Sequence, residues 1–278
     1  MEQRRSAFSQ GYVAIIGGVN IDIRGQSVGP LVPRDSNPGH VSSSLGGVGR
    51  NIAHNAALLG IPVHFLSALG DDDNGRRVEA SCKELGICLD SVRRIPGGRT
   101  STYVYLAGPD GDMALAVSDM EICREITPEY LGRNLSLLNG AAAVVCDANV
   151  PAQTIHFLAE RCTAPIFADP VSTVKAEKLR PVLGKLHTLK PNQLEAELLS
   201  GVSIKDRTSL VEAAREMVEV ARALKAPVHI SHLKAMGRDN WNRKIPQVLA
   251  LLDRARQEGL HLSCDVYPYT AGSTQLLH

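Results

Sequence analysis

The sequence predicts an α/β protein with a mostly parallel, doubly wound sheet, helices on both faces of that sheet and a small β lid. Short apolar runs alternate along the chain with stretches whose apolar residues recur at helical spacing. Two segments that interrupt this alternation are rich in strand-forming and turn-forming residues. Strands that alternate with helices pair in parallel and are buried on both faces, which is the basis of the predicted class.

The main elements follow from this alternation. Buried strands are expected at four apolar runs, 12–18, 61–69, 141–148 and 164–170. Helices are expected where apolar residues recur every three or four positions, at 49–60, 74–86 and 151–162. The rhythm continues with a helix, a strand, a second helix and a second strand, at 209–226, 226–232, 245–259 and 260–269.

Two segments are expected to form the lid. Residues 23–44 are polar and rich in glycine and proline, and residues 99–118 are typical of two strands joined by a turn at 108–111. Such an excursion from the main sheet can cover a binding site.

The composition of the chain argues against several classes of protein. The 278 residues include 30 Lys and Arg against 29 Asp and Glu, a net charge of +1 that argues against nucleic acid as the main partner. No run of 18 apolar residues would span a membrane, and the first residues lack a secretory signal, so we expect a soluble, cytoplasmic protein. The six cysteines form no CxxC pair and are expected to be reduced.

Asn20 and Asp22 follow the first predicted strand. Side chains two residues apart on an extended chain point the same way, so the amide and carboxylate together suit a vicinal diol beyond the carboxyl end of a strand. A turn capped by these two residues explains the pattern equally well.

The second motif is glycine-rich and opens a predicted helix. Gly46, Gly47 and Gly49 would let the backbone approach a ligand closely near free N–H groups. The motif is neither a Walker phosphate loop nor a good dinucleotide fingerprint, and a plain glycine-rich helix start remains the alternative.

The third motif contains Asn192 and Glu195. If Asn192 opens a helix, both side chains can face its N-terminus and hold Mg²⁺ and a nucleotide phosphate through water. The alternative is a capping box, in which each side chain bonds the backbone of the other residue.

In chain order the sequence contains GGVNIDIRG, RDSNPGHV, GGVGRNIAHNAALLG, SALGDDDNG, RTSTYVYL, SDMEI, CDANVP, FADPVS and HTLKPNQLEAELLSG. Together these strings resemble the ribokinase-like carbohydrate kinases, and within them the pseudouridine kinases. The resemblance implies a three-layer αβα fold, with a kinase domain at 1–210. It also implies ATP-dependent phosphorylation of a nucleoside 5′-hydroxyl, with Mg²⁺ as cofactor, and a homodimer through the lid.

The resemblance also implies roles for particular residues. Asn20 and Asp22 would hold ribosyl hydroxyls, in a pocket that Gly46, Gly47, Asn51 and Asn149 would line. Asp35, Ser36 and Asn37 would reach the ligand from the lid. Asn192 and Glu195 would organise Mg²⁺ and the triphosphate, with Glu195 acting through water.

The chain departs from this family after about residue 210. The family's GAGD motif, which carries the anion hole and the catalytic aspartate, does not occur, so no catalytic residue is assigned. Instead, residues 218–277, with the strings SHLK and DVYPYTAGST, resemble a piece of the zinc-dependent N-acyl-D-amino-acid deacylases. The C-terminal segment 211–278 is therefore interpreted as a substituted part of a chimera.

His232 is the one residue of this segment that matches a deacylase metal ligand. A zinc site needs three or four ligands, so zinc is not expected. Three hypotheses follow: an impaired nucleoside kinase, a catalytically inactive nucleoside-binding protein, or a zinc-dependent deacylase.

Overall fold

The computed structural model describes residues 11–201, 215, 218–219, 221–223, 228–230 and 244–264. The chain divides into two compact units, Met1–His187 and Thr188–His278. The boundary predicted near residue 210 falls inside the second of these units.

A parallel sheet forms the centre of the first unit. Its strands are β1 (Val13–Ile16), β4 (Val63–Leu66), β9 (Ala143–Asp147) and β10 (Ile166–Asp169), in the order β10-β9-β1-β4. Val13 pairs with Val63 on one side and with Ala143 on the other. Runs of branched apolar residues suit strands that are buried on both faces, so all four strands expected here are confirmed.

Helices cover this sheet at the predicted places. They are α1 (Val48–Leu58), α2 (Asp73–Glu84) and α5 (Ala152–Arg161). α1 packs on β1, β4 and β9, and Ala53 of α1 joins Ile15 and Phe65 in the buried core. The alternation of strand and helix therefore places the core as the sequence predicts.

The remaining elements of the first unit are not predicted individually by the sequence. Apart from β5 (Ala68–Gly70), which takes up the end of the predicted strand 61–69, they are the strand β6 (Arg93–Ile95), the 3₁₀ segments η2 (Glu121–Glu125) and η3 (Glu177–Lys185), and the short helices α3 (Pro128–Arg133), α4 (Leu135–Gly140) and α6 (Thr173–Ala176). These helices have at most six residues, too short for an apolar period to show in the sequence.

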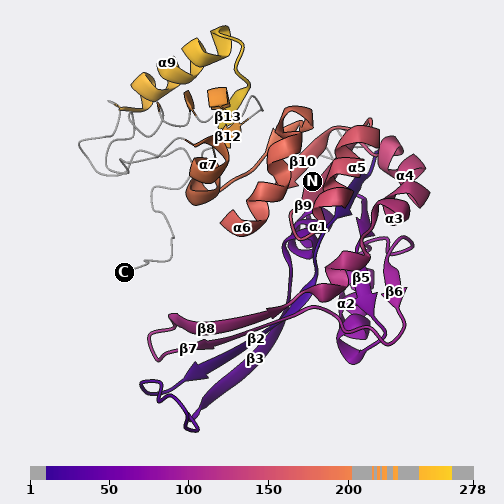
Figure 1. Ribbon diagram of the computed structural model, residues 1–278, viewed down its shortest axis with the longest axis vertical. Coiled ribbons are helices and arrows are strands. Elements are labelled where there is room, and N and C mark those ends of the chain that lie inside the picture. The colour runs from indigo at the N-terminus through magenta and orange to yellow at the C-terminus, as the bar shows by residue number, and fades with distance from the viewer. Residues whose placement is uncertain are drawn as a thin grey trace. The chain divides into compact units, whose positions relative to one another are not determined.

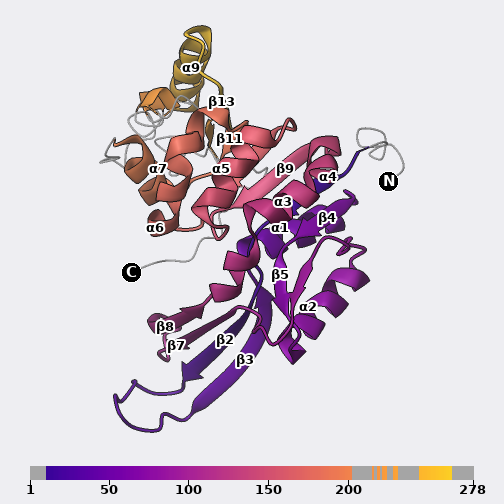
Figure 2. The same ribbon diagram turned by 45° about the vertical axis from the view of Figure 1, so that its right-hand side comes forward.

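The lid is a separate four-stranded sheet. Its strands are β2 (Asn20–Ser27), β3 (Gly39–Gly46), β7 (Thr102–Ala107) and β8 (Met113–Asp119), in the order β3-β2-β7-β8. Figures 1 and 2 show these strands running side by side as a ribbon that projects from the rest of the unit. The predicted lid is confirmed, and its first strand begins at Asn20, one of the predicted site residues.

In the lid sheet, paired residues and residues two apart along a strand point to the same side. The residues that share a side give the sheet one polar and one apolar face. Asn20, Asp22, Arg24 and Gln26 share one face. The register places apolar residues on the other face, namely Ile23, Val41, Val104, Leu106, Leu115 and Val117. Val41 is 79% exposed and Val117 65% exposed, so much of this apolar face is open to solvent.

The second unit contains, in its described part, three short parallel strands and two longer helices. The strands are β11 (Thr188–Leu189), β12 (Val228–Ile230) and β13 (Leu262–Cys264), and the helices are α7 (Gln193–Ser200) and α9 (Lys244–Gln257). Val228 pairs with both Leu189 and Leu262. Among the described residues, no helix has the length and apolar character needed to cross a membrane.

Candidate functional site

The predicted pair Asn20 and Asp22 stands at the start of β2, directly after the loop that leaves β1. Asn20 Nδ2 donates a hydrogen bond of 2.5 Å to Asp22 Oδ1, so the two side chains do lie together. Burial raises the pKa of the Asp22 carboxyl, and the hydrogen bond from Asn20 opposes that rise. The pair leaves Asp22 Oδ2 and Asn20 Oδ1 as acceptors for a ligand's hydroxyl groups.

Gly46 and Gly47 pack against this pair and against the loop before it. Gly46 pairs with Asn20 across the lid sheet, and a Cβ at Gly46 would overlap the Asp22 carboxylate. Gly47 has a φ of 94°, and its Cβ would lie 2.5 Å from the carbonyl oxygen of Gly18. The atoms that a side chain at Gly46 or Gly47 would meet belong to the protein itself, and the lining of a ligand pocket by these glycines stays a prediction.

Asn149 reaches the same loop from the end of β9. A Cβ at Gly18 would lie 2.8 Å from Asn149 Nδ2, so the Asn149 amide packs directly on the glycine backbone. Asn149 is 8% exposed, and its Oδ1 accepts a hydrogen bond of 2.6 Å from Lys175 Nζ. Asn20, Asp22, Gly46, Gly47 and Asn149 are thus assembled around one loop, Gly17–Val19.

Asp147 ties this assembly together, although the resemblance implies no role for it. Its Oδ2 accepts the backbone N–H of Gly18 at 2.9 Å and of Gly49 at 2.7 Å, and its Oδ1 accepts that of Asn149 at 2.9 Å. Complete burial raises the pKa of Asp147 to about 6, against the lowering effect of these hydrogen bonds. The one signal in the sequence is a carboxylate two residues before Asn149 at a strand end.

Asn51 lies on the first turn of α1, where its backbone N–H bonds the carbonyl oxygen of Gly47 at 2.9 Å. Its side chain is exposed, and its Oδ1 accepts a hydrogen bond of 3.3 Å from Arg50 Nη1. Asn51 therefore borders the assembly without a hydrogen bond to Asn20, Asp22 or Asn149.

The three lid residues predicted to contact the ligand lie elsewhere. Asp35, Ser36 and Asn37 belong to the loop between β2 and β3, and seven residue steps of β2, roughly 23 Å, separate the two ends of that strand. Asn37 Oδ1 accepts the backbone N–H of Val32 at 2.7 Å, and Asn37 Nδ2 donates to the carbonyl oxygen of Val32 at 3.0 Å. Within one chain, the loop that carries these three residues does not reach Asn20 and Asp22.

A cavity of about 300 Å³ opens at this outer end of the lid. Asp35 and Asn37 line it together with residues of β2, β3 and β7. Its walls include none of the residues assembled around the Gly17–Val19 loop.

The Asn192 and Glu195 pair, in the second unit, forms the capping box that is the alternative interpretation of this motif. Asn192 Oδ1 accepts the backbone N–H of Glu195 at 3.0 Å, and Glu195 Oε2 accepts that of Asn192 at 2.8 Å. The helix α7 begins at this cap, as predicted. The Glu195 carboxylate is 3% exposed and is already engaged in this contact.

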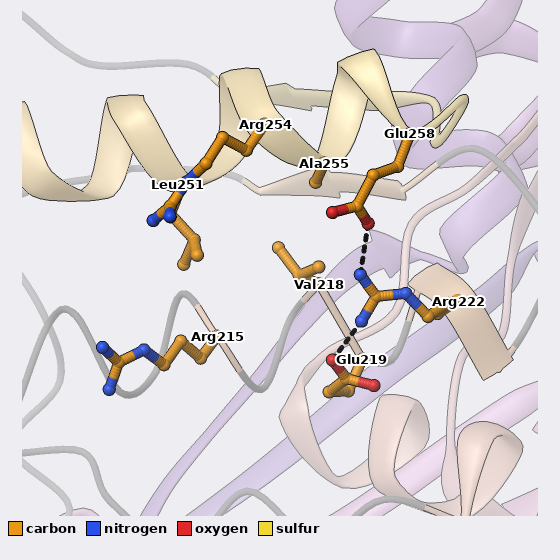
Figure 3. Close-up of a pocket in the computed structure, with 8 residues that line it drawn as sticks. All are labelled: Arg215, Val218, Glu219, Arg222, Leu251, Arg254, Ala255 and Glu258. Atoms are coloured by element: carbon orange, nitrogen blue, oxygen red, sulfur yellow. Dashed lines mark hydrogen bonds and ion pairs between the residues drawn. The ribbon is translucent and has the colours of Figure 1, made fainter.

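A second cavity, of about 510 Å³, lies inside the second unit, lined by residues of α9 and by Arg215, Val218, Glu219 and Arg222. Figure 3 shows the guanidinium of Arg222 bound to Glu219 on one side and, at 2.5 Å, to Glu258 on the other. Two further arginines, Arg215 and Arg254, line this cavity, and none of the predicted site residues does.

No group of three or more His, Cys, Asp or Glu side chains that could hold a metal ion occurs in the part of the chain that the structure describes. His232, the predicted remnant of a zinc site, lies outside the described residues.

Known proteins resemble this chain over its first three quarters. A pseudouridine kinase of Escherichia coli (strain K12) is 41% identical over 204 residues, which are 73% of this chain and 65% of that protein. An uncharacterized sugar kinase of the same organism, YeiI, is 38% identical over 74% of this chain and 58% of its own length. The chain thus spans less than two thirds of either relative.

The last part of the chain has a different and shorter similarity. A D-aminoacylase of Alcaligenes xylosoxydans xylosoxydans is 44% identical over 69 residues, which are 24% of this chain and 13% of that enzyme. Such a fragment carries a small part of the deacylase only.

Solved structures agree with the fold. A putative sugar kinase from Clostridium perfringens superimposes with a TM-score of 0.62 at 30% identity, over 79% of this chain and 69% of that one. A ribokinase of Arabidopsis thaliana, solved with ribose and ATP, has a TM-score of 0.63 over 78% of this chain and 70% of its own, and at 19% identity it supports the fold alone. The three-layer α/β fold with a mostly parallel sheet is therefore that of the ribokinases. Because the model of the pfkB family carbohydrate kinases matches residues 10–224, the chain belongs to that family.

Proposed function

We propose that this chain binds a ribosyl nucleoside, with pseudouridine as the first candidate, at the residues assembled around the Gly17–Val19 loop. The observation that carries the proposal is the Asn20–Asp22 pair, held at 2.5 Å and bordered by Gly46. Similarity to a pseudouridine kinase over 73% of the chain supports the choice of ligand.

The donors and acceptors of the site suit a ribose ring. Each hydroxyl of a vicinal diol both donates and accepts a hydrogen bond. Asp22 offers a carboxylate oxygen to a hydroxyl donor, and a hydrogen bond to a charged acceptor is stronger than one between neutral groups. Asn149 offers an amide N–H to a hydroxyl acceptor.

Binding can be tested without any nucleotide, by titration calorimetry with pseudouridine and no ATP. We expect saturable binding that Asp22→Asn weakens at least about tenfold, the size expected for a lost charge-assisted hydrogen bond. Asp112→Asn is the matched control, because it removes a carboxylate from the exposed turn of the lid. If the wild-type protein binds neither pseudouridine nor uridine, the proposed function is wrong.

We propose further that transfer of a phosphoryl group from ATP to the 5′-hydroxyl is severely impaired. By the resemblance, Asn192 and Glu195 would hold Mg²⁺ and the triphosphate, and a bound ion would neutralise charge on the phosphates. The GAGD motif does not occur in the sequence, and loss of a general base alone slows such reactions by about 10² to 10⁴.

The measurement is transfer of labelled phosphate from ATP to pseudouridine by the purified chain. We expect turnover near background, and Glu195→Ala is expected to abolish any residual rate. Turnover at several per second, a rate typical of a competent kinase, would contradict the proposal. Binding without turnover would favour an inactive nucleoside-binding protein.

We also propose that a second copy of this chain covers the apolar face of the lid. Six apolar side chains gather on this face, and a contiguous apolar patch on a soluble protein commonly marks an interface. Light scattering should give a dimer mass that Val117→Asp reduces to a monomer, with Ser118→Asp on the opposite face as the control. A monomeric wild-type protein would contradict this.

The C-terminal segment is proposed to be a substituted part of a chimera, with residues 1–210 from the kinase and 211–278 from a deacylase-like sequence. The short similarity to a D-aminoacylase supports this origin without supporting deacylase activity. An uninterrupted genomic read across codons 200–225 tests it, and a different reading frame at the junction would contradict it. A cytoplasmic location is also proposed, supported by the expectation that the six cysteines, which form no CxxC pair, are reduced.

A further inference from the structure

The orientation of the Asn149 amide is set by the residue that contacts it. Lys175 Nζ lies 2.6 Å from Asn149 Oδ1, and a lysine ammonium can donate hydrogen bonds but cannot accept them. The oxygen of the amide must therefore face Lys175, and its NH₂ group must face away from it. On that side lies Gly18, where an added Cβ would be 2.8 Å from Asn149 Nδ2.

Asp147 holds the backbone at the same point. Its Oδ1 accepts the backbone N–H of Asn149 at 2.9 Å, and its Oδ2 accepts that of Gly18 at 2.9 Å. The Asn149 amide NH₂ has two hydrogens and can donate one of them to a ligand.

A second lysine holds the backbone around Asn149. Lys178 Nζ donates to the carbonyl oxygens of Ala148, at 2.8 Å, and Val150, at 3.1 Å, the two residues that flank Asn149. Burial first, and the ammonium of Lys175 second, lower the pKa of Lys178. No carboxylate forms an ion pair with either lysine among the described residues. Lys178 therefore holds the main chain around Asn149, whereas Lys175 holds its side chain.

We propose that Lys175 is a positioning residue that sets the ligand specificity of the site, by holding the Asn149 amide as a hydrogen-bond donor toward the bound molecule. The ligand atom at this point must then be an acceptor, such as a hydroxyl oxygen of the sugar. This inference rests on the proposed function for the identity of the ligand, but not for the orientation of the amide.

Binding by substituted proteins tests the role of Lys175. Lys175→Met should weaken pseudouridine binding about tenfold, the size expected for one misplaced hydrogen bond, whereas Lys175→Arg keeps a donor and should restore most of the affinity. Lys185→Met, at the exposed end of η3, is the matched control and should bind as the wild type does. Equal affinity in Lys175→Met and wild type would overturn the proposal.

Deoxy analogues separate positioning from a general structural effect. We expect the wild-type protein to discriminate against either 2′-deoxypseudouridine or 3′-deoxypseudouridine, whichever lacks the hydroxyl at Asn149. Lys175→Met should lose most of that discrimination, because its amide is no longer held as a donor. A variant that binds pseudouridine and both analogues equally less tightly would show a structural role only, and would overturn the proposal.

Amide resonances of the ligand-free protein test the orientation by itself. The Asn149 side-chain NH₂ signal, identified by its absence in Asn149→Asp, should shift in Lys175→Met and stay in place in Lys185→Met. An unchanged signal in Lys175→Met would overturn the inference even if the wild-type protein binds pseudouridine. A shifted signal in a protein that binds no nucleoside would instead support the orientation and contradict only the proposed function.

Discussion

The carboxylate of Asp147 accepts a hydrogen bond of 2.7 Å from the backbone N–H of Gly49, a residue 98 positions earlier in the chain. The same oxygen accepts the N–H of Gly18. One buried side chain thus joins the loop after β1, the start of α1 and the end of β9. Since these three segments carry Asn20, Gly47 and Asn149, the geometry of the candidate site depends on Asp147.

Asp147→Asn is expected to lower the free energy of unfolding by about 2 kcal/mol at a pH of about 7.5, because one carboxylate oxygen that receives N–H donors becomes an NH₂ group. Urea denaturation followed by fluorescence or circular dichroism measures this. Asp90→Asn, on an exposed carboxylate, is the control and should change stability little. A variant as stable as the wild type would show that the three hydrogen bonds contribute nothing net.

The same carboxylate predicts a pH dependence of stability. Its pKa in the folded protein, about 6, is above the value of 3.8 expected when unfolded, so the folded state binds the proton more tightly. The contribution of Asp147 to the free energy of unfolding is therefore largest at low pH, and it is lost as the pH rises from about 4 through 6. The stability difference between wild type and Asp147→Asn should be larger near pH 5 than near pH 7.5. A difference that grows with pH would contradict the raised pKa.

Gly47→Ala is expected to destabilise the protein far more than Gly60→Ala. Both glycines have positive φ, 94° and 77°, but a Cβ at Gly47 would meet the Gly18 carbonyl at 2.5 Å and one at Gly60 would meet nothing within 4 Å. The strain at Gly60 should cost about 1 kcal/mol, and the collision at Gly47 should raise the total to roughly 3 kcal/mol or more. Denaturation midpoints of the two variants measure this, and equal losses would show that the collision relaxes freely.

Asn192→Ala should lower stability by about 1 kcal/mol, because it removes one hydrogen bond of the capping box that begins α7. Asn192→Ser retains a capping oxygen and should stay near wild type. Denaturation of both variants separates the cap from any role in holding Mg²⁺. If Asn192→Ser loses residual phosphate transfer while keeping its stability, Asn192 acts beyond the cap.

The predicted elements that the structure confirms are those with local signals. The strand that ends at Ile16 is a run of branched apolar residues, and Asn20 and Asp22 lie on one face because a strand alternates sides every residue. The helix that begins at Asn192 carries its own cap. In each case the residues that determine the feature lie within a few positions of one another.

The features that the sequence does not predict depend on contacts between distant segments. The partners of Asp147 at Gly18 and Gly49 lie 129 and 98 residues away, and Lys175 lies 26 residues from Asn149, with nothing local to mark the pair. The motif around Asp35 predicts a place near the sugar, but a motif carries no information on the length of the strands between two residues. The length of β2 determines how far Asp35 lies from Asn20, and that length is known only from the structure.

Asn20 and Asp22 are members of β2 itself, while Asn149 follows β9 of the central sheet. A ligand that contacts all three side chains would therefore connect the lid sheet to the central sheet.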